Sequence, residues 1–351
     1  MKEFIVIGAG QAGMAISYYL TQNKQDFLVV DANRDIGAPW LKRWDSLKLF
    51  TVSEYNHLPG LDFPHPKGYY ADKYDVANYL KSYVEKFKIP IDFNQKIKSL
   101  KKVEDHFVLE SDTQTYKAKH VIIATGPFHT PFTPLFHNKI GKDVVQIHSE
   151  NYKSPKQLQE GDTLVVGAGD SGVQILDEIA NTKRKVFFSG DTNITSIPQE
   201  ILGKTLWWWF SKIGFLSVSK YTWIGKKIST VGQPIIGTNV KVLFKKPNIE
   251  CVGRTLDVID DKIIFEKKEV KTIKNIVWAT GFKPNFSWIE NVSLDEDHYP
   301  KNFRGVSDIE GLYYLGLPWL YTRGSATLGG VKKDAKYLND YILKKETIKG
   351  K

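Results

Sequence analysis

The chain has 351 residues, which exceeds the usual size of one hydrophobic core and predicts two domains. Hydrophobic residues make up 42% and charged residues 25% of it, as in soluble globular proteins. The single cysteine, Cys251, excludes an internal disulfide, a CxxC redox pair and a cysteine-cluster metal site, and it suits a reducing cytoplasm. The net charge of +10 comes largely from scattered lysines, so we expect solvated faces and anionic dinucleotides rather than nucleic acid or a membrane surface.

The N-terminus enters a strand directly and lacks the basic and long apolar segments of a signal peptide. No apolar run approaches the ~20 residues of a membrane-spanning helix. The histidines form no metal-like cluster. We therefore expect a cytoplasmic protein with no integral membrane contact and no metal.

The first element is a buried strand at residues 4–8 (FIVIG), which enters the glycine turn Gly8-Ala9-Gly10-Gln11-Ala12-Gly13. A helix to about Asn23 follows, and the next strand, residues 27–30, ends at Asp31. A GxGxxG sequence between a strand and a helix is typical of a dinucleotide-binding βαβ unit, and an acid about 20 residues further on binds the ribose hydroxyls.

The segment that follows is unlike a simple crossover. A loop rich in aromatic and turn residues (36–51) precedes a helix predicted at 71–87, where Asp72 is a plausible cap. Short strands between residues 89 and 109 suggest an inserted β-meander. Residues 121–126 (VIIATG) form a buried strand with a small-residue turn, and a proline-rich loop follows.

A second unit occupies residues 163–191. An apolar strand enters the turn Gly167-Ala168-Gly169-Asp170-Ser171-Gly172, and a helix and the strand 186–189 come next. Gly167 allows the tight turn, Gly169 lets the backbone approach a pyrophosphate, and Gly172 allows close helix–strand packing. The pyrophosphate would lie at the helix N-terminus. One such turn is weak evidence, but two in one chain imply two dinucleotides.

Residues 276–281 (IVWATG) repeat the pattern of VIIATG, so the two units form an internal repeat. Between them, residues 198–236 hold many aromatic side chains, including Trp207-Trp208-Trp209 and Trp223. This stretch could line an apolar substrate channel or form a dimer or membrane-contacting surface. The chain ends with a strand at 312–316, a loop containing Arg323, the pair Gly329-Gly330 and a helix.

Several segments together resemble the flavin-containing monooxygenases, especially the shorter bacterial branch often described as potassium- or metal-transport flavoproteins. They are GAPW (37–40), RWDSLKLFT (43–51), HSENY (148–152), ATGF (279–282) and LGLPWLYTRGSATLGG (315–330). The resemblance covers nearly the whole chain. It implies an α/β fold of two Rossmann-like dinucleotide-binding domains, the second inserted in the first. Residues 1–155 and 285–351 would bind FAD, and residues 156–284 would bind NADH or NADPH.

The resemblance also assigns cofactor contacts by position in the family motifs. On the FAD side they are Gly8, Gly10, Gln11, Ala12, Gly13, Asp31, Ala32, Trp40, Leu47, Thr51, Ile97, Ala124, Thr125, Gly126, Leu328, Gly329 and Gly330. For the nicotinamide nucleotide they are Gly167, Gly169, Asp170, Ser171, Gly172 and Asp191, and the second ATG turn (Ala279, Thr280, Gly281) completes the set.

The chain departs from the family at three places. The signature FxGxxxHxxxY survives only as His148 and Tyr152, since Lys142 and Val144 stand at its Phe and Gly. The asparagine that larger members place over the flavin corresponds by spacing to Phe50. A phenyl ring cannot hydrogen-bond a flavin peroxide, so oxygen-adduct stabilisation is in question.

A third departure concerns the nucleotide. NADPH-preferring relatives carry Arg or Lys at the end of the second nucleotide strand, where this chain has Ser189-Gly190-Asp191. A carboxylate accepts from a free 2′-hydroxyl but repels a phosphate. The basic run at residues 183–185 lies before the strand. We therefore expect NADH to serve at least as well as NADPH; the alternative is that Asp191 points to solvent.

The implied reaction is oxygenation. The nicotinamide reduces FAD, O₂ forms a C4a-(hydro)peroxyflavin, and oxygen enters a small apolar sulfide, amine or ketone (sulfoxidation or Baeyer–Villiger reaction). Arg323 is the candidate charged group near the reacting flavin, with Tyr321 beside it; both could instead be structural. With Phe50 they form the candidate catalytic set. The alternatives are an NAD(P)H:flavin oxidoreductase or oxidase, favoured by Phe50, and a non-enzymatic FAD-binding transport accessory. A homodimer is possible.

Overall fold

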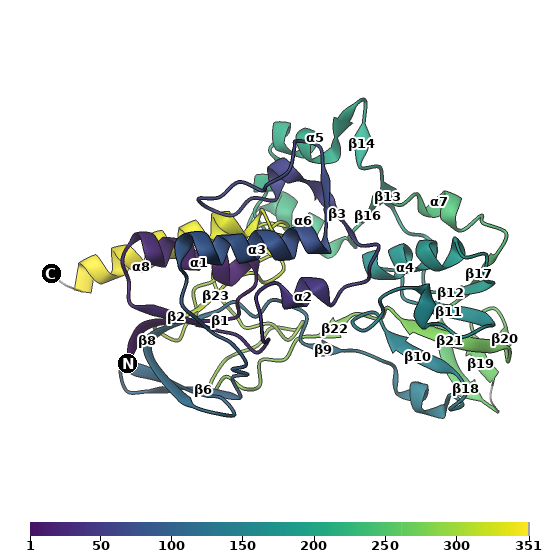
Figure 1. Ribbon diagram of the computed structural model, residues 1–351, viewed down its shortest axis with the longest axis horizontal. Helices are drawn as coiled ribbons and strands as arrows, with labels where there is room; N and C mark the ends of the chain where they lie inside the picture. The colour runs from purple at the N-terminus through teal and green to yellow at the C-terminus, as the bar shows by residue number, and fades with distance from the viewer. Residues whose placement is uncertain (261, 350–351) are drawn as a thin grey trace.

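The computed structural model describes residues 1–260 and 262–349 and has two lobes, each built on its own sheet (Figure 1). In the first lobe, at the left of Figure 1, the strand order is β5-β2-β1-β8-β7-β6, and β23 also pairs with β8. Strands β5, β2, β1, β8 and β23 run parallel, while β6 and β7 form an antiparallel meander with β8. The bounds are β1 (Lys2–Ile7), β2 (Phe27–Val30), β5 (Ile91–Asp92), β6 (Ser99–Val103), β7 (His106–Glu110), β8 (Thr115–Ile123) and β23 (Leu312–Tyr314).

Four helices belong to this lobe: α1 (Gln11–Gln22), α2 (Ala38–Leu41), α3 (Lys73–Phe87) and α8 (Val331–Lys349). The helix predicted at 71–87 is confirmed as α3, and Asp72 caps it. Asp72 accepts from the backbone of Tyr74 and Asp75, and the Asp75 side chain accepts from the Asp72 N–H, which satisfies donors that the first turn leaves free. The hairpin β3 (Lys48–Val52) and β4 (Tyr70–Asp72) lies just before α3.

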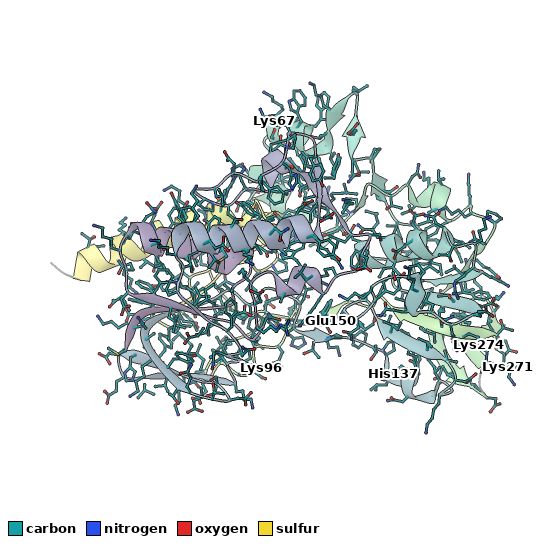
Figure 2. The ribbon with its side chains drawn as sticks, in the orientation of Figure 1. Lys67, Lys96, His137, Glu150, Lys271 and Lys274 are labelled. Atoms are coloured by element: carbon teal, nitrogen blue, oxygen red, sulfur yellow. The ribbon has the colours of Figure 1, made fainter. Side chains whose placement is uncertain are left out.

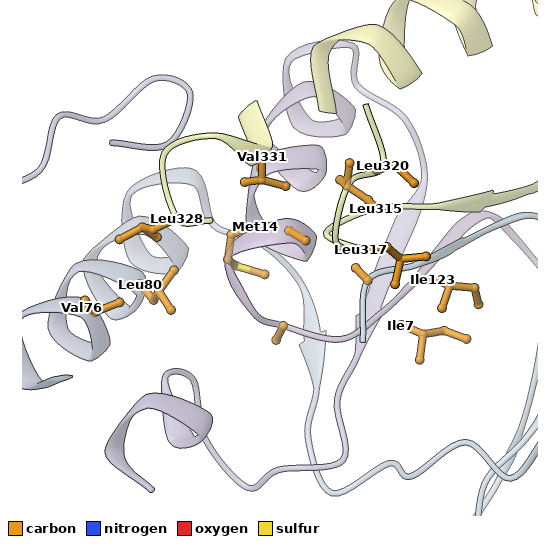
Figure 3. Close-up of a cluster of buried hydrophobic side chains, with 14 of the residues drawn as sticks. Ile7, Met14, Val76, Leu80, Ile123, Leu315, Leu317, Leu320, Leu328 and Val331 are labelled. Carbon is orange, nitrogen blue, oxygen red and sulfur yellow. The ribbon is translucent and has the colours of Figure 1, made fainter. Parts of the chain in front are cut away.

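The C-terminal segment is part of the first lobe's core. Figure 3 shows Leu317 and Leu328 among the side chains of β1, α1 and α3, close to Met14 and Leu80. Asn23, which ends α1, donates to Asn339 of α8 at 2.7 Å. Because the chain returns to the lobe where it began, the second lobe is an insertion, as the fold prediction stated.

The second lobe contains a parallel sheet in the order β10-β21-β11-β12-β17. Its elements are β10 (Val145–His148), β11 (Asp162–Val166), α4 (Asp170–Ala180), β12 (Val186–Ser189), β17 (Ile249–Gly253) and β21 (Ile273–Trp278). The apolar positions predicted for α4 are all buried, including Val173 and Leu176. A small antiparallel sheet of β18 (Thr255–Ile259), β19 (Lys262–Phe265) and β20 (Glu269–Val270) lies at its edge.

The chain crosses between the lobes at β9 (Thr130–Pro131) and β22 (Phe282–Lys283), which pair antiparallel. The predicted division after residue 155 falls too late, because β10 precedes it yet pairs with β21 of the second sheet. A strand of four residues without its own glycine turn gave no signal that would separate it from the preceding loop.

Residues 198–236 form what we call the aromatic arm, of which α5 and β14 project at the top of Figure 1. It contains β14 (Glu200–Ile201), β15 (Lys204–Thr205), α5 (Leu206–Lys212), α6 (Trp223–Thr230) and β16 (Ile235–Ile236). The last of these pairs with β13 (Ser196–Ile197), and α7 (Val240–Leu243) follows. Short 3₁₀ helices occur at Ser53–Tyr55, Leu135–Lys139, Pro155–Gln157 and Phe215–Ser217. Within residues 1–260 and 262–349, no helix has the length and apolar content needed to cross a bilayer.

Candidate active site

In the first glycine turn, two glycines allow close packing of the backbone and the third leaves space for a ligand. A Cβ at Gly8 would lie 2.6 Å from the carbonyl oxygen of Ala124, and one at Gly13 would lie 1.9 Å from the carbonyl oxygen of Gly8. Gly8 also has a φ of +107°, which L side chains rarely adopt. A Cβ at Gly10, by contrast, would meet nothing within 4 Å. The turn therefore closes tightly on the sheet and leaves open space at Gly10, beside the N-terminus of α1, where a pyrophosphate fits.

The second glycine turn has the same geometry. A Cβ at Gly167 would lie 2.2 Å from the carbonyl oxygen of Ala279, and one at Gly172 would lie 2.0 Å from that of Gly167. The space at Gly169, beside the N-terminus of α4, is open. In both turns, the glycine beside the helix N-terminus (Gly10 or Gly169) leaves open the space that a side chain would fill. A dinucleotide pyrophosphate fits that space, which we call the cradle of the turn.

Equivalent hydrogen bonds make the repeat structural as well as sequential. The N–H of Gly8 donates to Val30 at 2.8 Å, and that of Gly167 donates to Ser189 at 2.9 Å. Likewise the N–H of Ala124 donates to Ile7 and that of Ala279 to Val166, both at 2.8 Å. The two ATG turns thus occupy the same place, and Gly126 and Gly281 have φ of +71° and +80°.

Asp31 lies directly beside the first turn. Its Oδ2 accepts from the N–H of Ala9 at 2.6 Å, and its Oδ1 accepts from the N–H of Asn33 at 2.7 Å. The side chain of Ile97 is buried and that of Ala32 is exposed. Asp31 is therefore held at the carboxyl end of β2, the position that a ribose-binding acid requires; the ribose contact itself stays a prediction.

Asp191 is not the structural equivalent of Asp31. Because Ser189 occupies the position of Val30, Gly190 corresponds to Asp31 and Asp191 comes one residue later. Asp191 is exposed and accepts from the N–H of Asn193 at 2.8 Å. Of the basic run, Lys185 precedes β12 and its ammonium lies 3.7 Å from a carboxylate oxygen of Glu250.

The side of the site predicted to face the flavin contains a closed polar pair. The Thr51 hydroxyl donates to the side-chain oxygen of Asn56 at 2.5 Å, and the Asn56 amide donates to the Thr51 carbonyl at 3.2 Å. Asn56 is fully buried. Leu47 is buried in the same loop region and Trp40, on α2, is half-buried. Asn56, which the sequence left without a role, therefore holds the turn after β3.

The loop before α8 fits closely against the first lobe. A Cβ at Gly329 would lie 1.6 Å from the carbonyl oxygen of Tyr55, and one at Gly330 would lie 2.1 Å from that of Gly324. Gln11 of the first turn donates to the carbonyl of Ala326 at 3.2 Å. Leu328 is buried. The structure thus brings the predicted group Leu328 to Gly330 beside the first glycine turn.

Phe50 faces the aromatic arm. Its carbonyl accepts from the indole N–H of Trp207 at 2.8 Å, and the two rings stack with centroids 5.7 Å apart. The sequence noted Trp207 only as part of an aromatic run and gave no sign of this contact across more than 150 residues.

Arg323 and Asp170 come from different lobes and interact. Burial lowers the pKa of the Arg323 guanidinium, and the Asp170 carboxylate opposes that shift. Burial raises the pKa of the Asp170 carboxyl, and Arg323 opposes it in turn. Ser171, next to Asp170, is half-buried. Arg323 is therefore near enough to the second glycine turn to interact electrostatically with Asp170.

Tyr321, in contrast, is held by another arginine. The Arg304 guanidinium lies 3.7 Å from the centroid of the Tyr321 ring and 3.9 Å from that of Tyr337. The Tyr321 carbonyl accepts from the N–H of Lys220 in the aromatic arm at 2.8 Å. Tyr321 and Arg323 are neighbours in sequence but have different partners.

Two histidines that were not predicted as site residues connect the ATG turns to the crossings. His129 contacts the Thr125 hydroxyl at 3.1 Å through Nε2, and its Nδ1 accepts from the N–H of Asn285 at 2.8 Å. His148 contacts the Gly281 carbonyl at 3.0 Å through Nε2, and its Nδ1 accepts from the N–H of Glu150 at 3.1 Å. Figure 2 shows Glu150 where the two lobes meet.

These bonds fix each imidazole as the neutral tautomer with its proton on Nε2. Burial lowers the pKa of both rings. In the second ATG turn, the Thr280 hydroxyl also donates to the carbonyl of Phe132. The surviving signature residue Tyr152 donates to Glu178 of α4 at 2.9 Å. The two signature residues therefore hold parts of the second lobe, His148 the second ATG turn and Tyr152 helix α4.

Comparison with known proteins agrees with this geometry. Residues 5–200 match the pyridine nucleotide-disulphide oxidoreductase family. The chain is 42% identical to an uncharacterised CzcO-like oxidoreductase of Geobacillus kaustophilus, over 97% of this chain and 98% of that one. It is 25% identical to the probable indole-3-pyruvate monooxygenase YUCCA7 of Arabidopsis thaliana, over 89% of this chain and 82% of that one.

Among solved structures, the flavin-containing monooxygenase of Stenotrophomonas maltophilia matches with a TM-score of 0.80 at 21% identity, over 97% of this chain and 98% of that one. The architecture is thus that of this flavin-containing monooxygenase structure, with two dinucleotide-binding domains. The chain belongs to the pyridine nucleotide-disulphide oxidoreductase family and is an oxidoreductase similar over nearly its whole length to CzcO-like proteins.

Proposed function

We propose that this protein is an NAD(P)H-dependent flavin monooxygenase that transfers oxygen to a small apolar sulfide, amine or ketone. The observation that carries the proposal is the pair of glycine turns, each of which leaves open space beside a helix N-terminus, at Gly10 and at Gly169. An electrostatic interaction between Arg323 and Asp170 also links the loop that precedes α8 to the second turn. Two dinucleotides held by the two turns would therefore meet with their reactive ends between the lobes.

FAD, when bound, accepts hydride from the reduced nicotinamide and passes electrons to O₂. The chain supplies binding, orientation and exclusion of water. Gly10 and the N-terminus of α1 would hold the FAD pyrophosphate, and Gly169 with α4 would hold that of the nicotinamide nucleotide. Arg323 would place positive charge beside the second of these, and Phe50 stacked on Trp207 would present an apolar wall to the substrate.

We further propose that NADH serves at least as well as NADPH. Gly190 stands at the position equivalent to Asp31, and the next residue is the exposed Asp191. Neither can pair with a 2′-phosphate, and the carboxylate repels one. Lys185 lies at the opposite end of β12.

A second function is favoured by one observation. Phe50 has no side-chain donor, and Thr51 occupies both the carbonyl and the amide group of the nearby Asn56. With no donor supplied by these residues, reduced flavin would pass its two electrons to O₂, which becomes hydrogen peroxide, or to another acceptor. The protein would then be an NAD(P)H:flavin oxidoreductase or oxidase.

One experiment separates the two functions. The purified holoenzyme is given NADH or NADPH with methyl aryl sulfides or cyclic ketones, and nicotinamide oxidation, peroxide and oxygenated product are all measured. Product formation coupled to nicotinamide oxidation supports the monooxygenase. Oxidation that yields peroxide alone with every substrate rejects it in favour of the oxidase.

A further inference from the structure

We propose that the aromatic arm, residues 198–236, is a docking surface for an anionic lipid membrane. Lipid binding does not require the proposed reaction, but the arm also contacts residues of the candidate site, so docking would place that site beside an apolar phase.

The arm exposes an unusual amount of apolar side chain. Leu202 is 87% exposed, Trp223 76% and Ile213 70%. Seven of the twenty exposed large hydrophobic residues in the described part of the chain lie within it, although it is a small part of the sequence. They are Ile201, Leu202, Ile213, Tyr221, Trp223, Ile224 and Val231. Clusters of this kind mark interaction surfaces, whereas single exposed residues need no explanation.

The charge of the arm selects the partner. It contains five lysines (Lys204, Lys212, Lys220, Lys226 and Lys227) and one acid, Glu200. The ammonium groups of Lys204 and Lys212 lie 5.8 and 5.7 Å from the ring of Trp208, so cations and indoles share the same surface. Basic side chains mixed with exposed Trp and Leu are typical of segments that lie in the interface of an anionic bilayer.

The same charge disfavours a second copy of this chain as the partner. In a twofold dimer the arm would face itself, and lysines would meet lysines. The exposed apolar residues also lie on three separate elements, namely the tip between β14 and β15, the end of α5, and α6. Figure 2 shows a further cation, Lys67 of the first lobe, at the same upper edge of the molecule as α5 and β14.

The inner side of the arm is anchored to the first lobe. Besides the bond from Trp207 to Phe50, Tyr55 and Ser211 share a hydrogen bond of 3.3 Å, and Lys333 donates to Ser217 at 2.9 Å. The arm is thus fixed at its base while its apolar tips point outward. If the proposed function holds, an apolar substrate dissolved in the bilayer would have a short path to Phe50.

The test is co-sedimentation of the holoenzyme with vesicles of phosphatidylcholine alone or of phosphatidylcholine with phosphatidylglycerol, without any turnover. We expect binding to the vesicles that contain phosphatidylglycerol, and raised salt should weaken it. Lys226→Glu with Lys227→Glu should lower the partition coefficient at least about tenfold, because each lysine near such a surface adds to the attraction. Leu202→Ser with Ile213→Ser should lower it as well.

The control is Lys271→Glu with Lys274→Glu, which changes the charge equally at the far end of the second lobe (Figure 2). The ratio of bound flavin to protein verifies that each variant is folded. The proposal is overturned if the holoenzyme binds neither kind of vesicle or if the control reduces binding as much as the arm variants do. It is also overturned if sedimentation velocity shows a dimer that the arm variants dissociate, since a second copy would then cover this surface.

Discussion

The indole N–H of Trp207 donates to the carbonyl oxygen of Phe50 at 2.8 Å, so the aromatic arm and β3 of the first lobe are joined at the residue that stands in place of the family's asparagine. The bond uses a backbone oxygen, and the rings stack at an angle of 27°. The stacked pair at Phe50 therefore depends on contact between the aromatic arm and the first lobe.

This contact can be divided by two substitutions. Trp207→Phe removes the donor but keeps a ring, and should weaken the packing of the aromatic arm against the first lobe by about 1 kcal/mol. Trp207→Ala also removes the stacking, typically worth about 0.5–1.5 kcal/mol, and should cost more. The rate of limited proteolysis within residues 198–236 reports how firmly the arm packs against the first lobe. The control is Trp209→Phe, which removes a hydrogen bond to the Ile201 carbonyl inside the arm. Equal cleavage rates for wild type and Trp207→Ala would show that the contact does not hold the arm.

Arg323→Gln should impair the hydride donor's site without loss of FAD. A charge-assisted hydrogen bond contributes about 1.5–3 kcal/mol, so flavin reduction by NADH at subsaturating concentration should slow by about 10- to 100-fold. Arg323→Lys should restore part of that rate. Stopped-flow absorbance of the flavin gives the rates. Unchanged reduction in Arg323→Gln would leave the arginine as a structural partner of Asp170 only.

Asp191→Arg should increase the use of NADPH relative to NADH, because the new guanidinium can pair with the 2′-phosphate. The ratio of kcat/KM for the two nucleotides is the measurement, and Asp191→Asn separates loss of repulsion from gain of attraction. An unchanged ratio in both variants would show that Asp191 points to solvent and takes no part in nucleotide choice.

Acid should destabilise the joint between the lobes. Burial lowers the pKa of His129 and of His148. Above about pH 6.5 both rings are neutral in the folded and the unfolded chain alike, so they do not reduce the free energy of unfolding there. As the pH falls below that value, the two imidazoles bind protons in the unfolded chain but not in the folded chain, so the free energy of unfolding decreases.

The measurement is the urea midpoint at pH 7.5 and at pH 5.5, in wild type and in a variant with both histidines replaced by glutamine. The loss on acidification should be smaller in the variant. His57, whose pKa burial and Lys332 also lower, stays in both proteins and accounts for part of the remaining loss. An equal loss in the two proteins would place the acid sensitivity elsewhere.

The sequence predicted what depends on local pattern. Both glycine turns, both ATG turns and the helix capped by Asp72 follow from spacing and residue type, because those features act within a few residues of one another. The apolar positions of α4 were also correct, since a 3.6-residue period is visible without any partner.

What the sequence could not predict are contacts between distant segments. Nothing in the pattern around Trp207 indicates Phe50, and nothing around His129 indicates Asn285. The offset of Asp191 from Asp31 required the hydrogen bonds that align β12 with β2. The position of β10 likewise required knowledge of its partner, because a four-residue strand at a sheet edge has no turn signal of its own.

The central claim is that the first glycine turn binds FAD and the second binds the hydride donor. Gly10 and Gly169 test it directly, because a Cβ at either position meets no atom within 4 Å apart from its chain neighbours, so a small side chain should leave the fold intact while it fills the pyrophosphate cradle. Bound flavin is measured in Gly10→Val and Gly169→Val, with reduction by NADH and by dithionite. The account predicts that Gly10→Val loses FAD, whereas Gly169→Val keeps it, is reduced by dithionite and is not reduced by NADH. Loss of FAD in Gly169→Val with retention in Gly10→Val would contradict it.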